Sequence, residues 1–246
     1  MIFVIVLIIT AVRIKSMDSH RISGRILAEN IAGPGMLRLV EQSMQSRAQK
    51  TSVTEIAVKE RKYPQAALTF DDGPDIRYTP LLLDGLKERN VRVSFFLLGE
   101  KVEQYPELVE RMQKEGHLVG NHTYHHVQLN KLNETKAREE ILKTNNLIYE
   151  TTGVYPLYLR PPFGAWKKNL ELCVEMLPVF WTIDTLDWKV QNTEKIVRTV
   201  QEQIEDGAII LMHDEYDTSV EAALQVVDEL KNQGYELVTV DQLILP

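Results

Sequence analysis

From residue 63 onward, short apolar runs alternate with longer stretches in which apolar residues recur at helical spacing. The apolar runs, rich in β-branched and aromatic residues, predict strands at residues 66–70, 93–98, 117–120, 157–160, 179–183, 208–212 and 236–240. The amphipathic stretches between them predict helices at residues 81–89, 106–115, 134–150, 193–205 and 219–232. Strands and helices that alternate in this way form a parallel sheet with the helices outside it.

The length of the alternating region narrows the choice of fold. It spans roughly 180 residues, fewer than the ~250 of a complete eight-stranded barrel. We therefore expect an α/β fold, a distorted and incomplete (β/α) barrel of about seven parallel strands with outer helices. Active sites of such barrels lie at the carboxyl ends of the strands, so functional residues are expected there.

The chain before this region divides into two parts. Residues 1–15 begin with an apolar run to Val12, followed by Arg13 and Lys15. The run is shorter than the ~20 residues of a transmembrane helix and is similar to the apolar part of a signal peptide or signal anchor. No basic residue precedes the run, which a start codon placed too late would explain. The alternative to a signal segment is a buried N-terminal strand or helix. We expect an extracytoplasmic protein, secreted or anchored to the membrane at its N-terminus.

Residues 16–62 are polar and mixed, with one candidate amphipathic helix at residues 36–49. They carry no evident chemistry, and we expect a spacer or stalk. Residues 63–246 then form the main folded domain.

Charge and cysteine content exclude some classes of function. The formal net charge is −7, and no block of basic residues interrupts the chain, which argues against nucleic acid as a partner because phosphate binding needs clustered Lys and Arg. The single cysteine, Cys173, allows no intramolecular disulfide. Its apolar neighbours favour a buried structural role over a nucleophilic one.

Two adjacent carboxylates, Asp71 and Asp72, follow the first predicted strand and precede Gly73 and Pro74. Within a strand, neighbouring side chains point to opposite faces, but at a strand end both can turn into one pocket. Carboxylates crowded there repel each other unless a cation or a proton intervenes. The pair therefore predicts a positively charged partner.

If the positively charged partner is a metal ion, His122 and His126 are candidates for its remaining ligands. Spaced four apart, they would share one face of a helical turn. Two histidines and one carboxylate form a ligand set typical of catalytic zinc, whereas a histidine pair alone is weak evidence, because solvated histidine clusters are common. We expect His125, which lies off this face, and His117, which begins an apolar run, to be structural.

Three further motifs follow predicted strands. Arg160 precedes two prolines and Phe163, which together hold a rigid extended path or form a simple turn. Asp184 begins the segment Asp-Thr-Leu-Asp-Trp. His213 emerges from a buried apolar run, where it is placed for acid–base chemistry or for a structural hydrogen bond.

In order and residue type, the segments TFDDGP, HTYHH, RPPFG, DTLDW and LMH strongly resemble the motifs of the polysaccharide deacetylase family, also called the NodB homology domain or carbohydrate esterase family 4. The resemblance covers about residues 64–243 and has no departure at a catalytic position. The forms of the third and fourth segments are most similar to those of peptidoglycan N-acetylglucosamine deacetylases.

The resemblance implies a metal-dependent hydrolase. Asp72, His122 and His126 would hold one divalent metal ion, usually zinc, with cobalt or another divalent ion as an alternative. Asp71 would be the general base toward the metal-activated water, and His213 would protonate the leaving amine.

The resemblance also implies supporting roles. Arg160 would keep the base ionised and aimed, and Asp184 would pair with the histidine acid. The backbone N–H of Phe163 would stabilise the oxyanion. Trp188 and Leu211 would line the pocket for the acetyl methyl group, and Asp187 receives no role.

The implied reaction removes N-acetyl groups from a polysaccharide that contains N-acetylglucosamine and releases acetate. Peptidoglycan is the expected substrate partner. Chitooligosaccharides, muramic acid and acetylxylan are alternatives, and a catalytically inactive carbohydrate-binding homologue is the alternative from a different class.

Overall fold

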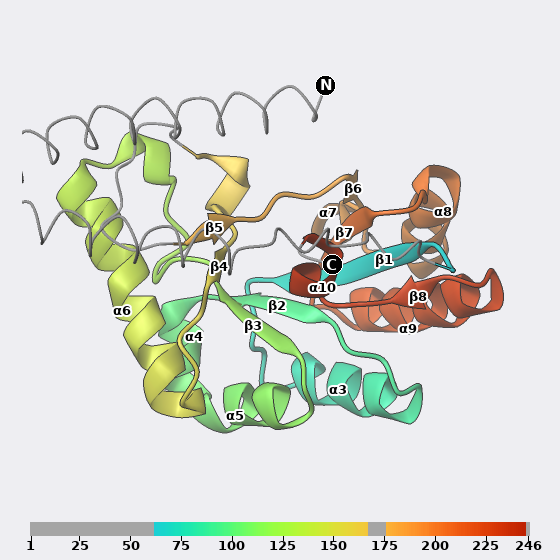
Figure 1. Ribbon diagram of the computed structural model, residues 1–246, viewed down its shortest axis with the longest axis horizontal. Coiled ribbons are helices and arrows are strands. Elements are labelled where there is room, and N and C mark those ends of the chain that lie inside the picture. The colour runs from blue at the N-terminus through green and yellow to red at the C-terminus, as the bar shows by residue number, and fades with distance from the viewer. Residues whose placement is uncertain (1–61, 167–175, 245–246) are drawn as a thin grey trace, which may run out of the picture. The chain divides into compact units, whose positions relative to one another are not determined.

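The computed structural model describes residues 62–166 and 176–244. The N-terminal segment, the candidate helix at 36–49 and Cys173 lie outside the described residues. Among the described helices, none combines the length and apolar character needed to cross a membrane. The described part is an α/β unit in which helices surround a curled sheet (Figure 1).

All strand pairings within the described residues are parallel, and seven strands follow one another across the sheet in the order β5-β4-β3-β2-β1-β7-β6. The short β8 adds to the start of β1, since β2 pairs with β1 only from Thr69 onward. The incomplete parallel barrel is therefore confirmed. The strands are β1 (Gln65–Asp71), β2 (Ser94–Leu97), β3 (Leu118–Asn121), β4 (Tyr158–Leu159), β5 (Leu177–Pro178), β6 (Ile183–Asp184), β7 (Ala208–His213) and β8 (Glu236–Leu237).

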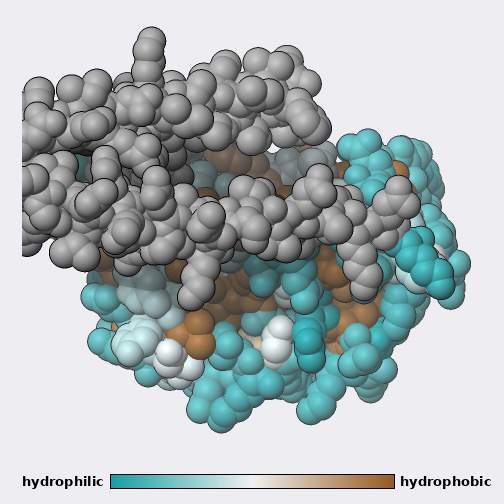
Figure 2. Space-filling view, in the orientation of Figure 1, coloured by the Kyte–Doolittle hydropathy of each residue, from teal (hydrophilic) through white to brown (hydrophobic). Residues whose placement is uncertain are grey.

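The five predicted helices are present, and shorter ones were not predicted. The predicted five are α3 (Tyr78–Glu88), α5 (Pro106–Lys114), α6 (Glu134–Thr152), α8 (Thr193–Gln203) and α9 (Asp217–Asn232). The additional ones are α4 (Gly99–Gln104), α7 (Asp187–Val190), α10 (Val240–Ile244) and the 3-10 turns η1 (Leu129–Lys131) and η2 (Pro162–Gly164). In Figure 2, the described residues along the lower rim, over α3 and α5, are mostly hydrophilic, as amphipathic outer helices require.

The alternation of side chains along β1 sets the two sides of the sheet. Ala66, Leu68 and Phe70 belong to the main core between the sheet and the helices. Ala67 belongs to a second cluster with Phe96 and Val240, on the barrel's inner side. Because the side-chain period of a strand is two, Asp71 at the end of β1 also faces inward.

One predicted strand, residues 179–183, was wrong. The backbone N–H of Val179 donates to the carbonyl of Leu159 in β4, whereas that of Thr182 donates to Ile209 in β7. β4 and β7 lie on opposite sides of the central strands. The segment therefore crosses between the two edges of the incomplete barrel, with only β5 and β6 at its ends paired as strands. Only its two end residues, Val179 and Ile183, are buried, while Phe180 is exposed.

Candidate active site

The carboxyl ends of the parallel strands bring the candidate side chains together. Asp71 and His213 are register partners on β1 and β7, and Asn121, which precedes His122, is the register partner of Leu159, which precedes Arg160. Four segments far apart in the sequence therefore end at the same edge of the sheet.

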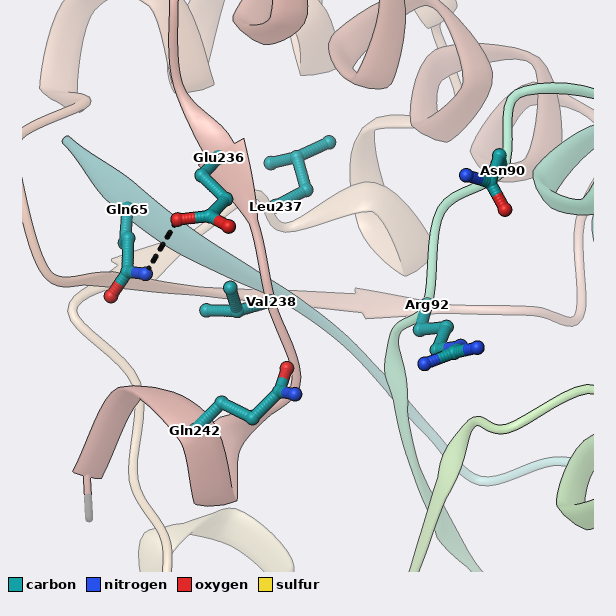
Figure 3. A pocket seen from close by; sticks show the side chains of 7 residues that line it. All are labelled: Gln65, Asn90, Arg92, Glu236, Leu237, Val238 and Gln242. Carbon is teal, nitrogen blue, oxygen red and sulfur yellow. Dashed lines mark hydrogen bonds between the residues drawn. The ribbon is translucent and has the colours of Figure 1, made fainter. Parts of the chain in front are cut away.

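The amino ends of the strands, on the opposite side of the sheet from these residues, carry a different feature. A surface hollow of about 510 Å³ lies where β1 and β8 begin, and its lining includes Gln65, Arg92, Glu236 and Gln242 (Figure 3). Its one carboxylate, on Glu236, accepts a hydrogen bond from Gln65 Nε2 at 2.8 Å. Barrel chemistry occurs at the carboxyl ends of strands, so this hollow is not the catalytic site.

The adjacent carboxylates share one pocket, as predicted. Asp72 adopts a left-handed backbone conformation with φ of 70°, which turns its side chain away from the strand alternation. His122 Nε2 lies 3.6 Å from Asp71 Oδ2 and 3.4 Å from Asp72 Oδ1. His126 Nε2 also lies 3.4 Å from Asp72 Oδ1.

The two histidines meet, but the expected helical turn is wrong. Residues 122–126 form no helix, and Thr123 and His126 have left-handed φ values of 68° and 54°. The two imidazole centroids nevertheless lie 5.0 Å apart. His122 hydrogen-bonds through Nδ1 to the carbonyl oxygen of Arg160 at 2.6 Å, which directs Nε2 toward Asp72.

The residues present fit a divalent metal ion. One ligand atom from each of Asp72, His122 and His126 lies within 4.8 Å of the others. Asp72 Oδ1 is buried and has no hydrogen-bond partner among the described residues, which is costly unless a cation satisfies it. Burial lowers the pKa of His122 to about 3, so its imidazole is neutral and able to act as a ligand.

Asp71 is paired with a fully buried arginine. Arg160 Nη1 donates to Asp71 Oδ1 at 2.9 Å and to Thr69 Oγ1 at 2.6 Å. Burial raises the pKa of Asp71, and the charge and hydrogen bond of Arg160 oppose that rise. Arg160 also contacts the carbonyl oxygens of Val179 and Phe180, at 3.4 and 3.5 Å, so it braces the crossing segment as well. The predicted contact between Arg160 and Asp71 is present.

The predicted partner of His213 was wrong. His213 Nδ1 lies 2.7 Å from Asp187 Oδ1, and its backbone N–H donates to Asp187 Oδ2 at 2.8 Å. Asp187 is fully buried at the start of α7 and also accepts from Ser219 Oγ. Asp184 instead accepts from the backbone N–H of Leu186 at 3.0 Å and caps its own turn.

The charge state of His213 follows from this contact. Burial by itself would lower the pKa of His213, but the hydrogen bond and charge of Asp187, with Asp71 and Asp72, together raise it to about 9. His213 Nε2 lies 3.9 Å from Asp72 Oδ2. A proton-bearing imidazole therefore stands beside the candidate metal group.

The remaining candidates lie around this centre. The ring of Phe163 is exposed and lies 4.6 Å, between centroids, from that of His126. Phe163 has a left-handed φ of 60°. Trp188 is half-exposed on α7, directly after Asp187. Leu211 is buried on β7, on the same strand face as His213.

The histidines expected to be structural are so. His117 is buried, accepts a hydrogen bond at Nδ1 from the backbone N–H of Val93 at 3.1 Å and packs edge-on against Phe95. His125 lies outside the metal group and pairs with Glu140 through Nδ1 at 2.8 Å.

Sequence reasoning missed two polar residues at the site. Asp187 stands in a segment already identified as chemical, three residues after Asp184, and its burial and its contact with His213 distinguish the two. Thr69 supplies Arg160 with its second acceptor, from the inward position two residues before Asp71. Inward spacing along β1 is the signal that could have identified Thr69.

Comparisons with known proteins agree with this site. The family model for polysaccharide deacetylase matches residues 59–180. The peptidoglycan N-acetylglucosamine deacetylase PgdA of Listeria monocytogenes is 42% identical over 185 residues, which cover 75% of this chain and 40% of that protein. The chain thus spans about two fifths of that relative's length. A peptidoglycan N-acetylglucosamine deacetylase of Bacillus cereus is 40% identical over 186 residues, 73% of this chain and 68% of the relative.

A solved structure is similar across the described fold. The structure of peptidoglycan deacetylase PdaC from Bacillus subtilis matches with a TM-score of 0.72 and 42% identity, covering 74% of this chain and 91% of that one. Fold, motif order and sequence identity all point the same way. The chain therefore belongs to the polysaccharide deacetylase family.

Proposed function

We propose that the chain is a metal-dependent hydrolase that removes N-acetyl groups from a polysaccharide containing N-acetylglucosamine, with peptidoglycan as the substrate. The observation that carries the proposal is the Asp72–His122–His126 group flanked by two opposite proton-transfer groups. On one side stands Asp71 with Arg160, and on the other His213 with Asp187.

Asp72, His122 and His126 would hold the ion, with zinc as the first choice and cobalt as a substitute, because two imidazoles and one carboxylate leave coordination positions open. A bound ion of this kind supplies a Lewis acid that polarises a carbonyl and lowers the pKa of water.

Asp71 would accept the proton of the attacking water as the water adds to the acetamide carbon. Arg160 holds one carboxylate oxygen at 2.9 Å and favours the ionised form, and the other oxygen, Oδ2, lies 3.6 Å from His122 Nε2, next to the metal group. His213, kept protonated by Asp187, would give its proton to the leaving amine. The products are acetate and a free amino sugar.

Three further groups would act on the substrate. The backbone N–H of Phe163 would donate to the oxyanion, in a segment whose two prolines hold it rigid. Trp188 and Leu211 would contact the acetyl methyl group. Trp188 lies directly beside Asp187 in sequence, and Leu211 lies on the His213 face of β7.

The substrate assignment rests on the relatives, whose names specify peptidoglycan. Action on peptidoglycan would place the enzyme outside the cytoplasm. Residues 1–15 would then serve as a signal or membrane anchor, residues 16–62 as a spacer, and residues 63–246 as the catalytic domain.

The experiment is mass-spectrometric detection of acetyl loss from purified muropeptides, chitooligosaccharides and acetylxylan, assayed side by side. We expect each N-acetylglucosamine of the muropeptides to lose one acetyl group, with faster turnover than on the other two substrates. Preference for a different substrate would replace peptidoglycan, and inactivity on all three would favour a carbohydrate-binding homologue.

Metal removal tests the ligand group directly. Dialysis against a chelator should abolish acetyl release, and added zinc or cobalt should restore it, because a cation is the partner that Asp72 Oδ1 lacks. Activity that survives complete chelation, with metal content checked by atomic emission, would contradict the metal-dependent scheme.

A further inference from the structure

The loop that carries both histidine ligands, residues 122–126, has no regular secondary structure of its own. Thr123 and His126 both adopt left-handed conformations, which cost non-glycine residues energy unless the surroundings hold them. Its backbone polar groups must also find partners elsewhere, because buried N–H and C=O groups are almost always paired. The contacts that hold this loop therefore determine the positions of the two imidazoles.

Two carbonyl groups of the loop accept hydrogen bonds from the backbone of α4. The N–H groups of Gly99 and Glu100, at the start of α4, donate to the carbonyls of Thr123 and Tyr124 at 2.9 and 3.3 Å. The first N–H groups of a helix lack partners within it, so this contact satisfies both elements. Of the loop's own N–H groups, that of His122 donates to the carbonyl of Leu97 at 2.9 Å, and that of Thr123 donates to Asn121 Oδ1 at 2.7 Å.

Two further N–H groups of the loop are held by one carboxylate, that of Glu140 on α6. Glu140 Oε2 accepts from the backbone N–H groups of Tyr124 and His125 at 3.0 and 2.9 Å. Its Oε1 lies 2.8 Å from His125 Nδ1. The side chain is only 16% exposed. Hydrogen bonds to an ionised acceptor in a mostly buried site are stronger than neutral ones.

The same helix also holds the residue before the loop. Asn121 Nδ2 donates to Asn145 Oδ1 at 2.6 Å and to the carbonyl of Ile141 at 2.9 Å, and all of these residues are buried. The loop is thus attached to α6 at its start through Asn121 and in its middle through Glu140. The asparagine pair is fully buried, whereas the side chain of Glu140 keeps 16% of its surface exposed.

We propose that Glu140 is a positioning residue for the metal site, which holds the backbone between His122 and His126 and thereby sets the affinity of the site for its ion. This inference rests on the proposed metal-dependent function. His122 has its own restraint in the Arg160 carbonyl, while the side chain of His126 is 30% exposed. Loss of Glu140 would therefore displace His126 more than His122.

The test compares Glu140→Ala with Glu139→Ala, in the full chain. Glu139 is the neighbouring exposed glutamate on α6 and makes no hydrogen bond or ion pair with the described residues of the loop, so it matches the change in charge and helix composition. The measurement is the dissociation constant for zinc, from competition with a chromophoric chelator. Glu140→Ala should bind about 10–100-fold more weakly than wild type, the usual range for groups that orient ligands, and Glu139→Ala should bind as wild type does.

A conservative variant separates positioning from folding. Glu140→Gln keeps one acceptor oxygen for the two N–H groups, so its zinc affinity should lie between those of wild type and Glu140→Ala. Excess zinc should recover much of the activity that Glu140→Ala loses, because the site is displaced but its ligands remain. Thermal unfolding of the metal-free proteins reports any general loss of stability, and if Glu140→Ala does not fold, Glu140→Gln carries the comparison.

Wild-type zinc affinity in both Glu140 variants, with wild type itself binding zinc, would overturn the role of Glu140 and leave the proposed function intact. The role of Glu140 would likewise be overturned if Glu139→Ala weakened zinc binding as much as Glu140→Ala does. Failure of the wild-type protein to bind zinc or cobalt would overturn the metal-dependent function itself.

Discussion

The Asp71→Asn protein is expected to keep its metal and to lose about 10²–10⁴-fold in kcat, the contribution typical of a general base. Asparagine preserves the shape of the side chain and can still accept the hydrogen bond from Arg160, which also retains Thr69 as an acceptor. It cannot take a proton from water at neutral pH. The measurements are the rate of acetate release at saturating substrate and the zinc content of the purified protein.

Asp72→Asn is the matched control, because it changes the neighbouring carboxylate in the same way. Asp72 Oδ1 is the oxygen that lies 3.4 Å from both histidine nitrogens. Its neutralisation should therefore lower zinc affinity, while Asp71→Asn should not. Rapid turnover by Asp71→Asn, with metal bound, would remove Asp71 as the base. Loss of metal from Asp71→Asn would instead assign it to the ligand group.

Asp187→Asn is expected to reduce kcat and to move the alkaline limb of the pH–rate profile to lower pH. The hydrogen bond and charge of Asp187 act against burial to raise the pKa of His213 to about 9. Removing the negative charge destabilises the imidazolium, so His213 loses its proton at a lower pH and the acid form disappears earlier as pH rises. A bound metal ion would lower the same pKa in both proteins, so the direction of the difference between them is unchanged.

The matched control is Asp184→Asn, the residue to which the sequence motifs alone assign this role. Asp184 caps the backbone of Leu186, and within the described part of the chain it makes no hydrogen bond or ion pair with His213. We expect its pH–rate profile to coincide with that of wild type, with a smaller change in kcat than in Asp187→Asn. A shift of the alkaline limb in Asp184→Asn and none in Asp187→Asn would contradict the observed pairing.

The directions in which Asp71 and His213 point follow from the local pattern of their strands. Asp71 faces the barrel interior because the side chains of β1 alternate, and Ala66, Leu68 and Phe70 must face the helices. His213 follows the same rule on β7, where Ala208, Ile210 and Met212 occupy the main core. A period of two is a property of the strand itself, so it can be recognised from the sequence before any contact is known.

Other features depended on contacts between distant segments. Residues 179–183 have the composition of a strand, yet they cross from β4 to β7, which lie on opposite sides of the central strands. His122 and His126 meet through a loop with two left-handed residues, not through a helical turn. Neither outcome has a local signature, because the partners that hold these segments, on α4 and α6 for the loop, are remote in sequence.

The sequence could not show which of the two aspartates in the DTLDW segment, Asp184 or Asp187, contacts His213. The sequence by itself determined the parallel α/β fold, the family and the cluster of charged side chains at the carboxyl ends of the strands, because these follow from strand and helix periodicity and from motif order. Only the tertiary structure decided which aspartate supports His213 and that Glu140 contacts the ligand loop. Those assignments depend on burial and on distances of about 3 Å, which spacing along the chain does not encode.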